Sequence, residues 1–191
     1  DETGSTVNAG KLKQIKGRGN STWKGAKKPY QIKLDKKADL LSSGDAANSN
    51  KTWVLLANYF DPSLLRNSLA FDLAGAMQMD PALQYRPVSL YYDGEYRGAY
   101  QLSEKVEIAS GRVDITDLEK LNEEANAAID DLATLPLAQA TTANGATYRY
   151  TTGMQSPADI TGGYLLEMDF ATRAQEELCY FVTKRGYYVV V

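Results

Sequence analysis

Residues 87–102 carry the sequence PVSLYYDGEYRGAYQL, which contains the clearest structural signal in this chain. Apolar and polar side chains alternate on both sides of Asp93-Gly94, the pattern of strands that bury one face. An Asp-Gly pair between two such strands favours a two-residue turn, because both turn positions need a positive φ. The stretch therefore predicts a β-hairpin and, with it, an antiparallel sheet.

Three segments on the N-terminal side have the same strand character. Leu12 lies between lysines just before a glycine-rich turn at residues 17–20. In residues 30–34 apolar side chains alternate with polar ones, which places Lys33 on the face opposite the apolar side chains. Residues 51–56 form a short apolar run that is typical of a buried strand. These strands are expected to extend the sheet.

Two principal helices are predicted. The first begins at Asp61-Pro62, because Asp61 can cap a helix and Pro62 suits its first position. Its apolar side chains recur every fourth residue and would form one buried stripe, which consists of Leu65, Leu69, Leu73 and Met77. The second helix covers residues 117–132, where apolar side chains again have helical spacing. The expected fold class is α+β, a mainly antiparallel sheet with two principal helices.

The rest of the chain consists of a polar stretch and two further strand regions. Residues 134–160 are rich in Ala, Thr, Ser, Gly and Pro, which indicates a surface loop or insertion. Residues 164–170 and 178–191 have strand character, and the second region is expected to form a hairpin that turns near Arg185-Gly186. We expect both tryptophans to lie in the core, and residues 1–191 to belong to a single domain.

The composition excludes several classes of catalytic site. The chain has no histidine, so Ser-His-Asp catalysis, Cys-His catalysis and a His-ligated metal are excluded. Its single cysteine, Cys179, excludes an internal disulfide and a Cys-rich zinc site. Any chemistry must therefore use carboxylates, Lys, Arg, Tyr or backbone amides.

The net charge of −3 conceals an uneven distribution. Residues 1–37 hold ten basic and three acidic side chains, a balance of +7, whereas residues 38–191 have a balance of −10. This asymmetry indicates either an anion-binding face or a solvated pair of basic strands. The acidic remainder would repel a polyanion, so no nucleic acid is expected as a partner. No run approaches the roughly 20 apolar residues of a membrane span, so no such span is expected.

Four side chains are candidates for a nucleotide-binding site, of which three are cations that could hold phosphate oxygens and one is a carboxylate. Arg18 lies in the glycine-rich turn, where a guanidinium and backbone amides can hold phosphate oxygens; alternatively it pairs with a carboxylate. Lys33 follows that turn on a strand, as the phosphate-holding lysine of kinase-type sites does, or it simply faces solvent. Lys27 and Lys28 are rival candidates for the same role. Arg66 lies at the edge of the buried face of the first helix, or it is an ordinary surface residue. Glu104 either pairs with Lys33, binds Mg²⁺ or is solvated.

The ordered motifs of the chain resemble those of the spore coat protein CotH family. They are RGNSTW at 18–23, KPYQIKL at 28–34, WVLLAN at 53–58, SLLRN at 63–67, GEYRGAYQLSE at 94–104, RVDI at 112–115 and GGYLLE at 162–167. The resemblance covers roughly residues 15–170, and within it only residues 134–160 look like an insertion specific to this chain.

The resemblance implies an atypical protein-kinase-like fold that binds ATP and Mg²⁺ and phosphorylates Ser of exported or coat proteins. It also implies an extracellular or cell-surface location in a bacterium, where some relatives occur in polysaccharide-associated assemblies such as the cellulosome. By the same resemblance, Lys33 and Glu104 are the leading candidates for the phosphate-holding lysine and its carboxylate. Arg18 and Arg66 become candidate electropositive groups near the nucleotide.

One departure from the family pattern limits what this chain is expected to do alone. The family's catalytic and Mg²⁺-binding aspartates lie downstream of the GGYLLE strand, in a stretch that residues 1–191 lack. We therefore expect an incomplete, N-terminal portion of the domain, without catalytic residues or metal ligands and inactive by itself, whose parent is a kinase. The alternative is a non-enzymatic extracellular module that binds carbohydrate or protein, which the tyrosine-rich hairpin and acidic body would suit.

Overall fold

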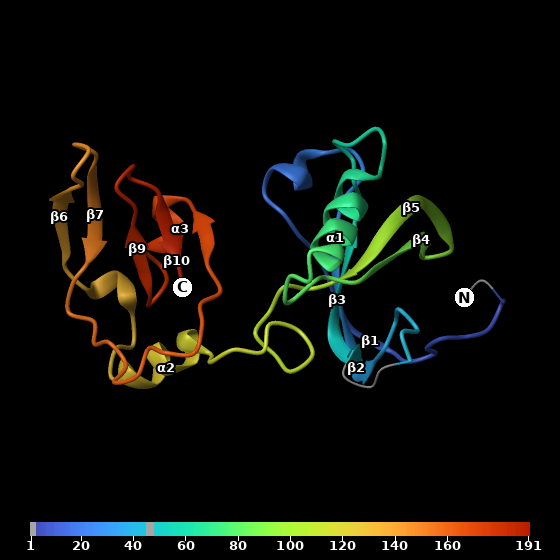
Figure 1. Ribbon diagram of the computed structural model, residues 1–191, viewed down its shortest axis with the longest axis horizontal. Coiled ribbons are helices and arrows are strands. Elements are labelled where there is room, and N and C mark those ends of the chain that lie inside the picture. The colour runs from blue at the N-terminus through green and yellow to red at the C-terminus, as the bar shows by residue number, and fades with distance from the viewer. Residues whose placement is uncertain (1–2, 45–47) are drawn as a thin grey trace. The chain divides into compact units, whose positions relative to one another are not determined.

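The structure is a computed structural model that describes residues 3–44 and 48–191 (Figure 1). It divides into two compact units, Asp1–Asp114 and Ile115–Val191, each of which is described by itself below. Both units are built mainly from antiparallel strands with short helices, so the predicted α+β class is confirmed. In the described part of the chain, no helix has the length and apolarity needed to cross a bilayer.

The first unit contains a five-stranded antiparallel sheet in the order β1-β2-β3-β5-β4 (Figure 1). Its strands are β1 (Leu12–Gly17), β2 (Tyr30–Ala38), β3 (Asn50–Leu56), β4 (Tyr85–Tyr92) and β5 (Glu95–Glu104), and a short 3-10 helix η1 (Ser21–Lys24) follows β1. Asp93 and Gly94 connect β4 to β5 with φ values of 50° and 77°. The predicted hairpin is therefore confirmed, together with the backbone conformation that selects Asp-Gly for this turn.

One face of this sheet carries the main core. Its buried side chains are Ile32, Leu34, Leu41, Trp53, Leu55, Ala57, Tyr100 and Leu102. Trp53 is fully buried, as predicted, whereas the same prediction for Trp23 is wrong because Trp23 is 41% exposed. Trp23 belongs to η1, outside the sheet, where its ring lies edge-on to Tyr30 with centroids 6.3 Å apart.

The helix of the first unit, α1 (Arg66–Ala76), differs from its prediction in both start and face. It begins at Arg66, because Asp61-Pro62 forms a preceding turn in which the Asp61 carboxylate accepts a hydrogen bond from the Arg66 backbone N–H, 2.9 Å. The predicted buried stripe is exposed instead, with Leu65, Leu69, Leu73 and Met77 between 55% and 68% exposed. The row formed by Ser68, Phe71 and Ala74 is half-buried, and Phe71 contacts Tyr85 of β4.

The second unit contains a three-stranded antiparallel sheet in the order β8-β10-β9 and a separate β6-β7 hairpin. Its elements are α2 (Leu118–Ala125), η3 (Leu132–Thr134), β6 (Leu137–Thr141), β7 (Thr147–Thr151), β8 (Glu167–Asp169), α3 (Ala171–Ala174), β9 (Tyr180–Val182) and β10 (Tyr188–Val190). The hairpin predicted at residues 178–191 is confirmed, with Gly186 in its turn at φ 85°.

Two segments of this unit depart from prediction. Residues 134–160 are not a loop throughout, because β6 and β7 pair around an Asn-Gly turn in which Gly145 has φ 81°. The α2 helix ends at Ala125 rather than near residue 132. It ends there because the buried Asn126 side chain bonds the backbone on both sides: it donates to the carbonyl of Asn122 and accepts from the N–H of Gln155.

Candidate functional site

The sheet register separates two of the four predicted site residues. Ile32 of β2, Trp53 of β3 and Glu104 of β5 are partners in adjacent strands, so their side chains share the core face. Lys33 is paired with Thr52 and therefore lies on the opposite face, where it is exposed. The structure thus does not bring Lys33 and Glu104 together.

Glu104 has a different cationic partner, which the sequence analysis did not identify. Its Oε1 forms an ion pair with Nη1 of Arg112, and its Oε2 accepts a hydrogen bond from the backbone N–H of Gln84, 2.8 Å. The guanidinium carbon of Arg112 lies 4.7 Å from the centroid of the Trp53 ring. Both partners are almost completely buried, so this pair belongs to the interior of the first unit.

The other two predicted residues, Arg18 and Arg66, lie on the wall of one pocket of about 270 Å³. The turn after β1 supplies Arg18, and the first turn of α1 supplies Arg66. The segment that follows β3 contributes the rest of the polar wall, which includes Asn58, Tyr59 and Asp61. Arg18 and Arg66, which are far apart in the sequence, therefore lie at one pocket.

Local backbone geometry fixes the position of Arg18. The Arg18 N–H donates to the carbonyl of Pro29, 3.3 Å, which ties the turn to the start of β2. Gly19 follows with φ 82°, and a Cβ at this position would overlap the Thr22 hydroxyl, so only glycine fits. Burial lowers the pKa of the Arg18 guanidinium. Among the described residues, no carboxylate forms an ion pair with it.

Asp61 organises the opposite side of the pocket. Its carboxylate accepts hydrogen bonds from the Ser63 hydroxyl, 2.6 Å, and from the Arg66 N–H, 2.9 Å, and these bonds lower the pKa of Asp61. The Arg66 Nε lies 3.6 Å from Asp61 Oδ1, and the Arg66 side chain is 78% exposed. Since Asp61 is one carboxylate beside two guanidinium groups, it neutralises only part of the positive charge around the pocket.

The charges and donors of this pocket suit an oxyanion. Two guanidinium groups and one carboxylate leave a net positive charge. The paired N–H groups of a guanidinium match the spacing of phosphate or carboxylate oxygens. The half-buried position of Arg18 strengthens such a contact, because water screens it less than it screens a surface charge. In residues 3–44 and 48–191, no cluster of three or more acidic or cysteine side chains has the arrangement of a metal site.

A chain of side-chain amides borders the pocket, and the sequence analysis did not identify it. Asn67 Nδ2 donates to Asn58 Oδ1, 2.8 Å, and Asn58 Nδ2 donates to Gln101 Oε1, 3.1 Å. Asn58 has φ 49°, a conformation that asparagine tolerates better than most residues. That tolerance was a signal in the sequence, because Asn58 lies two residues after the end of a predicted strand.

One family model covers most of the chain, including the segments that form the pocket. The family model described as CotH kinase protein matches residues 15–155, which is more than half of the chain. Arg18, Lys33, Arg66 and Glu104 all lie inside the matched range. No curated protein and no solved structure gives a significant match to the chain.

Proposed function

The chain belongs to the CotH kinase family, and we propose that it is the part of an atypical Ser protein kinase that holds the phosphates of ATP. The parent protein would transfer the γ-phosphate to Ser hydroxyls of exported or coat proteins at a bacterial surface, including those of polysaccharide-associated assemblies. The fold of the first unit would serve as the nucleotide-binding part of a kinase-like architecture. Residues 1–191 would be inactive on their own.

The observation that carries this proposal is the convergence of Arg18 and Arg66 on one pocket. Phosphoryl transfer depends on positioning and on neutralising charge that develops on phosphate oxygens, which guanidinium groups do well. Arg18 is half-buried and, among the described residues, has no carboxylate partner, so a bound phosphate would supply its counter-charge. Mg²⁺ would be held by carboxylates of the parent and would neutralise the phosphates when bound.

Phosphate transfer by the parent protein tests the proposal. Incubation of the parent with labelled ATP, Mg²⁺ and a Ser-rich protein substrate should give labelled product. Arg18→Ala should lower kcat/KM by tenfold or more, because a charge-assisted hydrogen bond contributes about 1.5–3 kcal/mol. Arg97→Ala is the matched control, since Arg97 is an exposed arginine paired with Glu95 on the hairpin. An inert parent that also fails to bind ATP would contradict the proposal.

Lys33→Ala and Glu104→Gln belong in the same assay. We keep the prediction that both residues contribute to nucleotide binding, Lys33 by direct contact with a phosphate and Glu104 through its place in the core. Lys33→Ala should then weaken ATP binding without changing the thermal stability, because Lys33 is exposed on its strand. Unchanged ATP binding would restrict the site to the arginine pocket.

A non-enzymatic binding module is the second candidate, and the tip of the β4–β5 hairpin favours it. Tyr91 and Tyr96 are 66% and 58% exposed there, and their ring centroids are 5.2 Å apart. Exposed paired rings suit contact with the apolar faces of sugars or with a protein partner. Glycan binding that is lost in Tyr91→Ala but survives Arg18→Ala would support this candidate over the kinase.

A further inference from the structure

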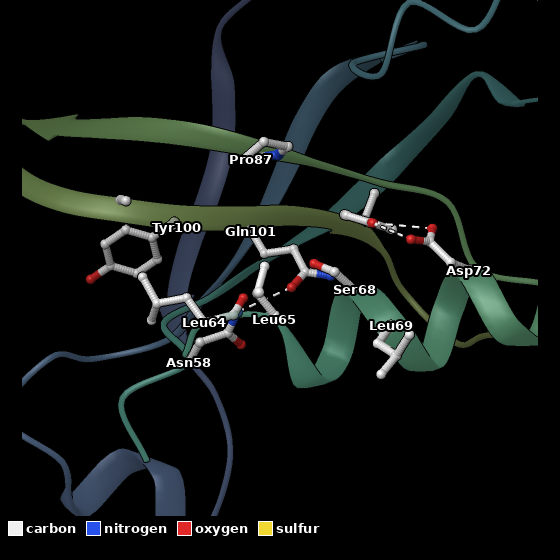
Figure 2. A pocket seen from close by; sticks show the side chains of 11 residues that line it. Asn58, Leu64, Leu65, Ser68, Leu69, Asp72, Pro87, Tyr100 and Gln101 are labelled. Carbon is white, nitrogen blue, oxygen red and sulfur yellow. Dashed lines mark hydrogen bonds between the residues drawn. The ribbon is translucent and has the colours of Figure 1, made fainter. Parts of the chain in front are cut away.

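A second and larger cavity lies between α1 and the β4–β5 hairpin of the first unit (Figure 2). Its volume is about 550 Å³, within the range of roughly 300–1,000 Å³ that small-molecule sites occupy. Leu69 of α1, with Leu64 and Leu65 just before the helix, forms one wall, and Pro87 of β4 lies on the sheet wall. The lining is therefore largely apolar, and it differs in chemistry from the arginine pocket.

A buried polar group without a partner faces this cavity. Gln101 of β5 is only 4% exposed, and its Nε2 has no hydrogen-bond acceptor in the described part of the chain. Figure 2 shows the Gln101 side chain reaching from β5 toward α1, beside Ser68. A buried donor of this kind is destabilising unless an acceptor satisfies it, so an occupant that supplies an acceptor would be stabilised here.

The amide chain holds that donor in place. Gln101 Oε1 accepts from Asn58 Nδ2, and Asn58 in turn accepts from Asn67 on α1. Because Oε1 is engaged in this way, the geometry of the planar amide fixes the direction of Nε2. The donor is therefore pre-oriented, which reduces the entropy lost when a ligand binds.

The charge around the cavity disfavours an anionic ligand. Asp72 of α1 lies on its wall, and both carboxylate oxygens accept from the Tyr85 hydroxyl at 3.1 Å. No arginine or lysine side chain is among the described residues that line the cavity. A phosphate or carboxylate would meet only the Asp72 charge here and would be repelled.

We propose that this cavity is a binding site for a neutral small molecule with a compact apolar body and one carbonyl-type acceptor, which Gln101 Nε2 recognises. An apolar body would cover the exposed Leu65 and Leu69 side chains, and the acceptor would satisfy the buried donor. A docking helix suits the cavity less well, because its backbone carbonyls are already bonded within the helix. The site does not depend on the proposed phosphate pocket.

Titration of the whole chain with benzamide, followed by NMR of the side-chain amides and leucine methyl groups, tests this proposal. Benzamide should shift the Gln101 amide signals together with the methyl signals of Leu64, Leu65 and Leu69. Toluene, which has the same ring but no acceptor, should bind about fivefold more weakly, because one neutral hydrogen bond is lost. Gln101→Met should remove this preference, whereas Gln14→Met, on the exposed edge of the sheet, should keep it.

Three results would overturn the proposal. Equal affinity for benzamide and toluene in the unaltered chain would show that Gln101 does not recognise an acceptor. This comparison needs no variant, so it holds whether or not Gln101→Met folds. Benzamide-induced shifts confined to other surfaces would place the ligand elsewhere. If the same methyl signals shift when the protein concentration is raised without a probe, the cavity binds a second copy of the chain instead. Arg18→Ala should leave benzamide binding unchanged, which separates this test from that of the phosphate pocket.

Discussion

Arg112 is the cation that Glu104 meets in the folded chain. The two side chains are 1% and 7% exposed, and their ion pair lies against the Trp53 ring. From the sequence we considered Lys33 as the cation that pairs with Glu104. The sequence could not identify Arg112, because the order of the strands decides which cation faces Glu104, and that order is a tertiary property. Arg112 reaches Glu104 through a turn that a bridge between Ile108 and Val113 closes.

Replacing Arg112 by leucine should destabilise the first unit strongly. Removing one partner of a buried ion pair leaves an uncompensated charge, which costs about 3–5 kcal/mol in the free energy of unfolding. Arg97→Leu, at an exposed ion pair, should cost less than about 1 kcal/mol. Chemical denaturation monitored by tryptophan fluorescence measures both.

A double variant separates the charge from the packing. Glu104→Gln combined with Arg112→Leu removes both charges, so part of the lost stability should return relative to Arg112→Leu alone. A cost for Arg112→Leu no larger than that for Arg97→Leu would show that the buried pair described here does not form in solution.

The helix α1 shows what periodicity can and cannot predict. The spacing of Leu65, Leu69, Leu73 and Met77 correctly indicated residues that share one helical face. It did not indicate which face packs on the sheet, because that depends on the partner surface. The half-buried row is formed by Ser68, Phe71 and Ala74 instead.

The exposure of that leucine face leads to a prediction at the scale of the helix. Leu73→Gln should change the free energy of unfolding by less than about 0.5 kcal/mol, since Leu73 is 55% exposed. Leu55→Ala, in the buried face of β3, should cost about 2–5 kcal/mol because it leaves a cavity. Thermal denaturation of the two variants compares them directly, and a larger cost for Leu73→Gln would mean that α1 packs by its leucine face.

Turn chemistry was the most informative local signal for the strands. Asp93-Gly94 and Arg185-Gly186 both mark hairpin turns that the sequence predicted. Asn144-Gly145 carries an equally good signal, but the prediction for residues 134–160 rested on their composition alone. The β6–β7 hairpin shows that a specific dipeptide is better evidence than the average character of a segment.

Charge distribution is the clearest property at the scale of the whole chain. Residues 1–114 hold 16 basic and 13 acidic side chains, whereas residues 115–191 hold 5 and 11. The first unit therefore carries +3 and the second −6, and both Arg18 and Arg66 belong to the positive unit. The basic excess noted in residues 1–37 lies within the first unit and includes Arg18, whereas Arg66 lies outside that stretch. The pocket itself could not be predicted, because it forms only when the turn after β1 meets the start of α1.

The central claim is that the pocket of Arg18 and Arg66 binds the phosphates of ATP, and calorimetric titration of this chain with ATP tests it most directly. We expect saturable binding to the unaltered chain, retained in Arg97→Ala and weakened tenfold or more in Arg18→Ala, as the loss of a charge-assisted bond requires. Binding should also weaken as the salt concentration rises, because the contact is electrostatic. Binding of equal strength in Arg18→Ala and Arg97→Ala, or no binding to the unaltered chain, would contradict the claim.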